Sequence, residues 1–302
     1  MNDLEVRELR YFVAVAEELH FGRAAARLGM AQPPLSRAIR ELERRLGVRL
    51  LERTTRQVTL TPPGEVFLRD ARTALDTVTA AARRARHAAR PERGLRVALK
   101  ADYDAGLLPR ILAAYREEEA ALPVELLLGG RNEQAPALRD GRADVALLVT
   151  PFDDRNLDTE VLLTEPRLVA LSAADPLAAR PRLSMADLAG RPLPDGTLAE
   201  WDGAEPPPGR RPPRTGLDLA QVCNLVELGS AIWFVPVSVA RRHPRPALAY
   251  REVADLSPSE LAVGWPQGSR SPAVAAFVRA AVAVAGGPPA ASVGLDPLRT
   301  GA

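Results

Sequence analysis

The stretch QPPLSRAIRELERRL carries side chains of the types that read DNA. Ser36, Arg37, Arg40 and Arg44 fall on one side of a helical pattern, opposite a run of leucine and isoleucine, and Gln32 precedes them. A glutamine amide can pair with two atoms of adenine and an arginine with two atoms of guanine, whereas hydroxyl and guanidinium groups also hold phosphates. The pattern predicts a helix that contacts DNA; a solvated helix face is the alternative.

The elements that would position this face are short. Residues 6–18 form a first amphipathic helix, and a second short helix ends at Gly29, where a helix C-cap would place glycine. The third helix starts at Pro33 and Pro34, where proline is tolerated, and Gly47 ends it. Its buried stripe is Leu35, Ile39, Leu42 and Leu46.

A small basic hairpin follows the third helix. Residues 48–51 and 57–60 flank ERTTR, which makes the whole segment a winged helix-turn-helix. Cations and hydroxyls at the wing tip are expected to hold phosphate, so the wing candidates are Arg53, Thr54, Thr55 and Arg56. Removing Arg53 would then weaken binding to all sequences alike. His20 is expected to pack at the start of the second helix.

Charge is divided unevenly along the 302 residues. Residues 1–90 carry 17 Arg and 11 acidic residues, a net charge of +6, whereas the rest of the chain has a net charge of −4. A net positive charge in the N-terminal part is typical of a module that binds a polyanion, and the remainder of the chain would then form a separate module. The charged N-terminus lacks an apolar signal core, so we expect a cytoplasmic protein with no membrane partner. The single cysteine, Cys223, excludes an intrachain disulfide and favours a small buried residue.

Beyond the wing the pattern changes twice. Residues 65–90 read as one long, alanine-rich helix, either a dimerising linker or a rigid exposed spacer. After the boundary at residues 91–94, strand and helix patterns alternate: strands at 95–99, 124–128 and 145–149, and helices at 107–119 and 133–139. Such alternation predicts a parallel sheet covered by helices. Residues 192–213 are rich in proline and glycine and read as a loop.

This order of elements resembles that of the LysR-type transcriptional regulators, over residues 6–285. The most specific match is the segment LRYFVAVAEELHFGRAAARLGMAQPPLSRAIRELERRLGVRLLERTTRQVTLTPPG. Weaker matches are LRDGRADVALL and LVELGSAIWFVPVSVA. The resemblance implies promoter DNA and a small effector as partners, a homodimer or homotetramer, and RNA polymerase as a further candidate partner. The resemblance also implies that five residues of the third helix face DNA: Gln32, Pro34, Ser36, Arg37 and Arg40.

The resemblance implies an α/β chain in four parts. These are an all-α winged helix-turn-helix DNA-binding domain (1–64), a linker helix (65–90), a two-lobed effector-binding domain resembling periplasmic binding proteins (91–287) and a disordered tail (288–302). Lobe one would span about 95–162 plus 262–287, and lobe two about 163–261.

An effector should lie beyond the carboxyl ends of the strands, near helix N-termini. Lys100, the only lysine, stands where the family often has a hydroxyl residue, and with Arg131 it could hold an anionic effector. Alternatively, Lys100 pairs with Asp102 or Asp104, and Asp104 could also cap the next helix. Trp233 is either a pocket or a core residue. The full set of effector-site candidates is Lys100, Ala101, Asp102, Arg131, Asn132, Val149, Thr150, Trp201, Ser230 and Ala231.

Three other functions remain as rivals. An enzyme is disfavoured because residues 95–285 show no nucleophile–base pair, metal cluster or glycine-rich phosphate loop, so neither a metal nor a cofactor is expected. An architectural DNA binder without a ligand would not bind small molecules saturably. A redox sensor would need Cys223 to be exposed and reactive.

Overall fold

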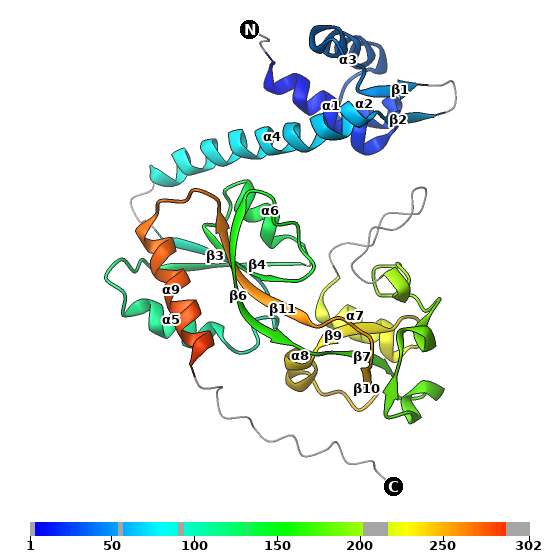
Figure 1. Cartoon of the computed structure of the whole chain (residues 1–302), viewed down its shortest axis with the longest axis vertical. Helices are drawn as coiled ribbons and strands as arrows, with labels where there is room; N and C mark the ends of the chain where they lie inside the picture. Colours follow the sequence, from blue (N-terminus) through cyan, green and yellow to red (C-terminus); the bar gives the residue numbers. More distant parts are fainter. Residues whose placement is uncertain (1–3, 54–56, 90–93, 131, 202–216, 288–302) are drawn as a thin grey trace. The chain divides into compact units, whose positions relative to one another are not determined.

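The computed structural model describes residues 4–53, 57–89, 94–130, 132–201 and 217–287. The chain divides into two compact units, Met1–Ala89 and Arg90–Ala302, which we call the head and the regulatory domain (Figure 1). The predicted tail, the wing tip at 54–56 and most of the proline-rich loop lie outside the described residues. None of the described helices is long and apolar enough to cross a membrane.

The head contains the predicted helices and hairpin. They are α1 (Val6–Glu18), α2 (Phe21–Arg27), α3 (Gln32–Leu46), the antiparallel pair β1 (Leu51–Arg53) and β2 (Val58–Leu60), and α4 (Pro62–Ala88). The stripe predicted for the third helix is confirmed, because Leu35, Ile39 and Leu42 are fully buried against Phe12 and Val15 of α1.

Local chemistry explains where these helices begin and end. The ring of His20 accepts a hydrogen bond from the backbone of Arg23 (3.2 Å), so His20 caps α2, consistent with its expected place. Gly29 and Gly47 adopt left-handed backbone angles (φ +65° and +71°) after α2 and α3, a conformation that glycine adopts without strain. Thr61 caps α4 through its hydroxyl, which accepts from Gly64 (3.0 Å).

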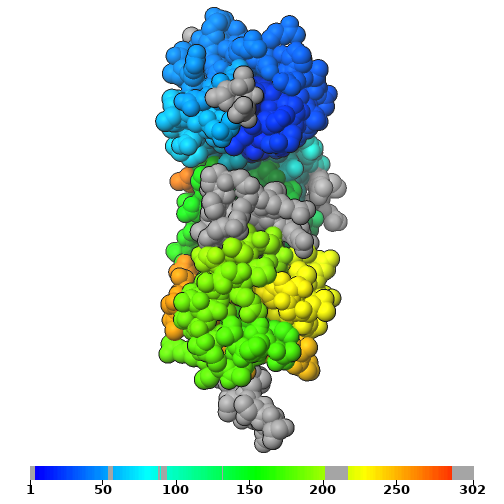
Figure 2. Space-filling model, turned by 90° about the vertical axis from the view of Figure 1, so that its right-hand side faces the viewer, coloured from blue at the N-terminus to red at the C-terminus, as the bar shows by residue number. Residues whose placement is uncertain are grey.

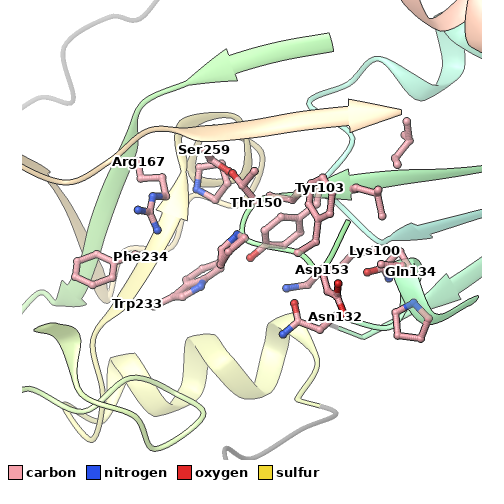
Figure 3. Close-up of a pocket in the computed structure, with 18 of the residues that line it drawn as sticks. Lys100, Tyr103, Asn132, Gln134, Thr150, Asp153, Arg167, Trp233, Phe234 and Ser259 are labelled. Atoms are coloured by element: carbon pink, nitrogen blue, oxygen red, sulfur yellow. The ribbon is translucent and has the colours of Figure 1, made fainter. Parts of the chain in front are cut away.

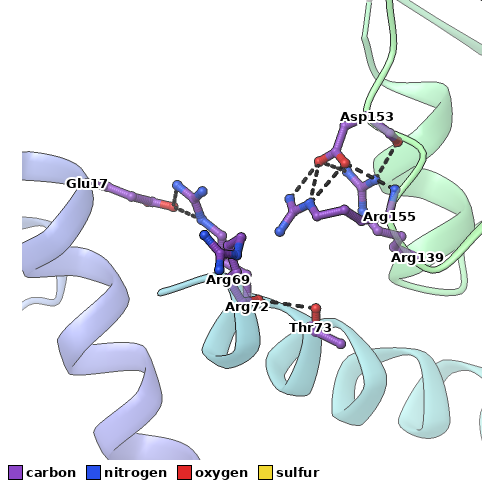
Figure 4. Close-up of polar contacts among 7 residues, drawn as sticks. All are labelled: Glu17, Arg69, Arg72, Thr73, Arg139, Asp153 and Arg155. Carbon is purple, nitrogen blue, oxygen red and sulfur yellow. Dashed lines mark hydrogen bonds and ion pairs between the residues drawn. The ribbon is translucent and has the colours of Figure 1, made fainter. Parts of the chain in front are cut away.

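The long helix α4 belongs to the head at its start. Phe67 packs edge-on against Phe12 of α1 (ring centroids 5.0 Å apart), and Arg72 pairs with Glu17 at 2.9 Å (Figure 4). Further along, Val78, Ala82 and Ala85 are exposed at spacings of four and three residues. The second half of α4 therefore presents an apolar stripe to its surroundings.

The first sheet of the regulatory domain has the order β4-β3-β5-β11-β6. As predicted, β3 (Leu95–Lys100), β4 (Val124–Gly129) and β5 (Val145–Val149) are parallel; β11 (Ser259–Pro266) and β6 (Leu157–Glu165) add an antiparallel edge. Successive side chains of each strand point to opposite faces of this sheet, and different helices cover the two faces. Val97, Leu99 and Leu147 pack under α5 (Leu108–Arg116) and α9 (Pro272–Gly286), whereas α6 (Gln134–Arg139) covers the opposite face. We call this assembly lobe one.

Lobe two differs from the expected parallel pattern. Its sheet, β8-β10-β7-β9, is mostly antiparallel: β7 (Arg167–Ser172) pairs antiparallel with both β10 (Leu248–Val253) and β9 (Trp233–Pro236). Only β8 (Arg182–Leu183) runs parallel to its neighbour. The sequence patterns missed β6, β10 and the helix α8 (Val237–Arg242), and the segment Met185–Leu188 is a 3-10 turn. Figure 2 shows residues of about 170–200 in yellow-green beside α7 (Leu219–Glu227) in yellow.

The chain crosses between the lobes at two places. Pro166 separates β6 of lobe one from β7 of lobe two, and residues 254–258 separate β10 from β11. These crossings lie a few residues from the division expected at 162/163 and 261/262. Both segments are therefore candidates for the hinge on which the lobes would move.

Candidate DNA-binding surface and effector pocket

The polar face of α3 lies opposite its buried stripe. Gln32, Arg37 and Arg40 are exposed, and Pro34 and Ser36 are half-buried beside them. Within the described chain, the side chains of Arg37 and Arg40 form no ion pair or hydrogen bond. The five helix residues predicted to face DNA are thus all at least partly exposed, and two guanidinium groups are available to an anion.

Arg53 is held inside the head. Its guanidinium pairs with Glu43 of α3 at 2.6 Å and lies over the ring of Phe21, 5.0 Å from the ring centroid. The same carboxylate accepts the backbone N–H groups of Leu50 (3.0 Å) and Leu51 (3.1 Å). Burial holds the pKa of Arg53 below its ordinary value. Arg53 therefore joins β1 to α3, and its predicted contact with phosphate stays a prediction; Thr54, Thr55 and Arg56 lie outside the described residues.

A cavity of about 540 Å³ opens between the two lobes, and we call it the interlobe pocket (Figure 3). Figure 3 shows Arg167, Trp233 and Phe234 of lobe two on one side and Lys100, Asn132 and Gln134 of lobe one on the other. Its size suits a small organic ligand. Its remaining lining includes Tyr103, Arg139, Val149, Thr150, Phe152, Asp153 and Ser259.

The cations that line the interlobe pocket have partners in the wall. Arg139 donates to the carbonyl oxygen of Asp153 at 2.8 Å, and Arg167 to that of Ser257 at 2.7 Å. The ammonium group of Lys100 lies 3.8 Å from the ring centroid of Tyr103. Among its described residues, the pocket lining contains three cations, Lys100, Arg139 and Arg167, and one carboxylate, that of Asp153. This excess of positive charge favours an anion.

Asp153 is strongly held by arginine. Arg155 donates to both carboxylate oxygens (2.6–3.0 Å), and Arg139 approaches one of them at 3.5 Å (Figure 4). The hydrogen bond from Arg155 is the main reason that the pKa of Asp153 is lowered. The lowered pKa favours the ionised carboxylate, whose charge is shared with the two arginines.

The loop after β3 connects the pocket to lobe two. Asp104 accepts from Arg242 of α8 at 2.7 Å and from the backbone N–H of Leu108 at 3.2 Å. Leu107 is the N-cap residue of α5, so Asp104 contacts the first turn of the helix without being its cap residue. Asp102 lies 3.3 Å from the imidazole of His243. Both carboxylates, expected as alternative partners of Lys100, instead contact residues of lobe two: Asp104 contacts Arg242, and Asp102 contacts His243.

Only some of the residues that line the interlobe pocket were predicted from the sequence. Four of the ten effector-site candidates line it: Lys100, Asn132, Val149 and Thr150. The described lining does not include Ala101, Asp102, Ser230 or Ala231; Arg131 and the side chain of Trp201 lie outside the described residues. Trp233 is both core and pocket, being 6% exposed and part of the lining. Tyr103, Arg139, Phe152, Arg167 and Phe234 were missed.

Cys223 does not fit a redox-sensing role. Its side chain is fully buried in lobe two, and burial raises the pKa of its thiol. A scarce, inaccessible thiolate reacts slowly with oxidants.

The two units together define a DNA-binding transcriptional regulator with a separate ligand-binding domain. Residues 6–65 match the model of the bacterial regulatory helix-turn-helix protein, lysR family, and residues 88–286 match the LysR substrate binding domain. The chain therefore belongs to the LysR family of transcriptional regulators.

Known relatives match over most of their length. The chain is 33% identical to the HTH-type transcriptional regulator AlsR of Bacillus subtilis, covering 91% of this chain and 94% of AlsR. It is also 33% identical to the Hca operon transcriptional activator HcaR of Escherichia coli, covering 91% and 96%. Among solved structures, CbnR, a LysR family transcriptional regulator, is 28% identical with a TM-score of 0.50 and coverage of 93% and 99%.

Proposed function

We propose that this regulator binds promoter DNA through two heads of a dimer, with α3 of each head in the major groove. The observation that carries this proposal is the exposed polar face of α3, with Gln32 at its N-terminal end and the guanidinium groups of Arg37 and Arg40 unpaired within the described chain. The N-terminal residues of a recognition helix meet the base edges, so Gln32 would read a base and the arginines would contact guanine or phosphate.

The apolar stripe on α4 supports dimer formation. Val78, Ala82 and Ala85 are small and exposed, and a second copy of α4 could cover them at close approach. Two heads related by a two-fold axis would require a two-fold symmetric DNA site. Ala82→Arg is expected to shift the protein toward monomer in analytical ultracentrifugation, whereas an unchanged mass would locate the dimer contact elsewhere.

Selection of random duplex DNA tests the DNA-binding proposal. Wild-type protein should enrich a two-fold symmetric sequence, and Gln32→Ala should relax the preference at one base position in each half-site, at a cost of about 1–3 kcal/mol. No enrichment by wild type above non-specific binding would contradict sequence reading by this face and favour an architectural role.

For the interlobe pocket we infer an anionic effector with a flat, apolar body. Lys100, Arg139 and Arg167 supply positive charge, and Tyr103 and Trp233 supply aromatic surface. A carboxylate would lie near the cations while the apolar body packs on the rings. This arrangement requires no metal or cofactor.

The intrinsic fluorescence of Trp233 offers a direct test. Benzoate is a suitable probe, with benzamide as its neutral counterpart and acetate as an anion without a ring. We expect a saturable change with benzoate that is at least tenfold weaker for both controls. Equal responses to benzoate and benzamide would contradict a charge-selective pocket.

A further inference from the structure

A basic concavity lies on the head, and its lining combines two of the predicted DNA-contacting residues, Arg40 and Arg53, with residues to which the sequence assigned no role. Its volume is about 560 Å³, and it lies between the second half of α3, the turn at residues 47–50 and β1. We call it the arginine crease. Its lining residues are Arg40, Glu43, Arg44, Gly47, Val48, Arg49, Leu51 and Arg53.

Two of its four arginines are committed to the protein itself. Arg53 pairs with Glu43, and Arg44 pairs with Glu41 on the same helix. Arg40 and Arg49 are exposed, and no described residue forms an ion pair or hydrogen bond with either side chain. The crease therefore carries two available guanidinium groups, one on α3 and one on the turn before β1.

Arg40 and Arg49 line the same concavity. The positive charges of Arg40 and Arg49 both contribute to the lowered pKa of Arg53, after the larger effect of its burial. Like charges gathered around one concavity repel one another. An anion placed among them would relieve that repulsion, and the sequence pattern gave no hint of it because Arg49 lies outside the helical stripe.

The geometry of a winged head indicates which anion would lie there. Arg40 is eight residues beyond Gln32 on α3, about 12 Å along the helix axis. With Gln32 at the base edges as proposed above, Arg40 and the crease would lie farther along the helix, away from those bases. In such a complex the anions available to them are the phosphates of the DNA backbone.

We propose that Arg49, together with Arg40, binds a backbone phosphate of the DNA in the arginine crease. The proposal rests on the DNA-binding function proposed above and adds a contact to it. Such a contact positions the head without reading sequence. Glu43 and Arg53 act as positioning residues, because their ion pair holds β1 against α3 and keeps the crease open.

Salt dependence of DNA binding is the first test. Arg49→Gln should reduce the slope of log affinity against log salt concentration by about one, and weaken specific and random duplexes by the same factor. Arg69→Gln is the matched control, since Arg69 is an exposed arginine of α4 whose side chain forms no hydrogen bond or ion pair in the described chain (Figure 4). Circular dichroism and the melting temperature of each variant check folding.

An unchanged slope for Arg49→Gln, or a loss confined to the specific duplex, would overturn the phosphate contact. Failure of the wild-type protein to bind any duplex would instead contradict the proposed function itself, so the two failures are distinguishable.

Single neutral phosphates sharpen the test. Methylphosphonate at one position beside the major-groove half-site should weaken binding by wild type and by Arg69→Gln, but have little further effect on Arg49→Gln. If the losses from the neutral phosphate and from Arg49→Gln multiply at every position along the half-site, Arg49 contacts no backbone phosphate there and the proposal is wrong.

Discussion

The face of α3 and the lining of the interlobe pocket both carry positive charge, but they hold it differently. On α3, Arg37 and Arg40 are exposed and form no ion pair or hydrogen bond within the described chain. In the interlobe pocket, Arg139 and Arg167 donate to backbone carbonyl groups at 2.8 and 2.7 Å. One surface presents flexible side chains to a large partner, whereas the other fixes its charges before a ligand arrives.

The difference follows from what each surface would bind. A duplex brings many phosphates, and long side chains can adjust to them one by one. A small ligand makes few contacts, so its affinity depends on groups that lose little freedom on binding. In the regulatory domain, arginine–carboxylate pairs also hold loops and lobes together, and their burial decreases in the order Arg96–Asp144, Arg242–Asp104, Arg180–Asp187. Three predictions follow that order.

The largest effect should come from Arg96, which is 8% exposed. It donates to Asp144 at 2.7 and 3.0 Å and to the carbonyl oxygen of Gly141 at 2.7 Å. Arg96→Met is expected to lower the free energy of unfolding of the regulatory domain by about 3–5 kcal/mol, because Asp144 loses its charged partner and keeps only the hydrogen bond from the backbone N–H of residue 96. Urea unfolding followed by tryptophan fluorescence measures this, since all three tryptophans lie in that domain.

Arg142→Met is the control for Arg96. Arg142 pairs with Asp140 at the surface, and its loss should cost less than about 1 kcal/mol. Equal losses for the two variants would show that burial does not decide the strength of these pairs.

An intermediate effect is expected at Arg242, the partner of buried Asp104. Arg242→Ala should destabilise the loop at residues 101–107 by about 1–3 kcal/mol and speed its amide hydrogen exchange. The neighbouring Arg241 is exposed and has no ion pair within the described chain, so Arg241→Ala should leave that loop protected. Identical exchange in both variants would mean that Arg242 does not hold the loop.

The smallest effect should be at Asp187, near the surface of lobe two. The hydrogen bond from Arg180 (2.7 Å), followed by those from Ser184, lowers the pKa of Asp187 from 3.8 to about 2. A lowered pKa contributes stability above pH 4 that is lost as the pH falls toward 2. Asp187→Asn should therefore lower the melting temperature slightly at pH 7, and the difference should vanish near pH 2.

Asp154→Asn serves as the comparison, because Asp154 is exposed and forms no side-chain hydrogen bond or ion pair in the described chain. A pH-independent difference between wild type and Asp187→Asn would contradict the ion-pair explanation.

The head could be predicted from sequence because its surface lies on one helix. Leu35, Ile39 and Leu42 fix which side of α3 is buried, and this turns Arg37 and Arg40 outward, whereas Gln32 is exposed at the first residue of the helix. Arg53 is the exception. Nothing in the hairpin pattern indicated that Glu43, ten residues earlier, would pair with it.

The interlobe pocket could be predicted mainly at the ends of lobe-one strands, with Trp233 of lobe two left open as a pocket or core residue. Lys100 ends β3 and Thr150 follows β5, where parallel strands of one sheet place their neighbours together. Arg167 begins β7 in lobe two, and no motif indicated that its side chain would line the pocket. The partners of Asp102 and Asp104 lie about 140 residues further along the chain. Those contacts arise from the packing of two sheets, which local periodicity does not encode.

The separation of the two surfaces is tested most directly by titrating Arg37→Ala and wild type with the selected DNA site while recording the fluorescence response to benzoate in the same samples. We predict that the variant binds the site about tenfold more weakly, with an unchanged benzoate response and an unchanged melting temperature. Equal DNA affinity for the two proteins, or parallel loss of DNA and benzoate binding, would contradict the assignment of DNA contact to the α3 face and ligand binding to the interlobe pocket.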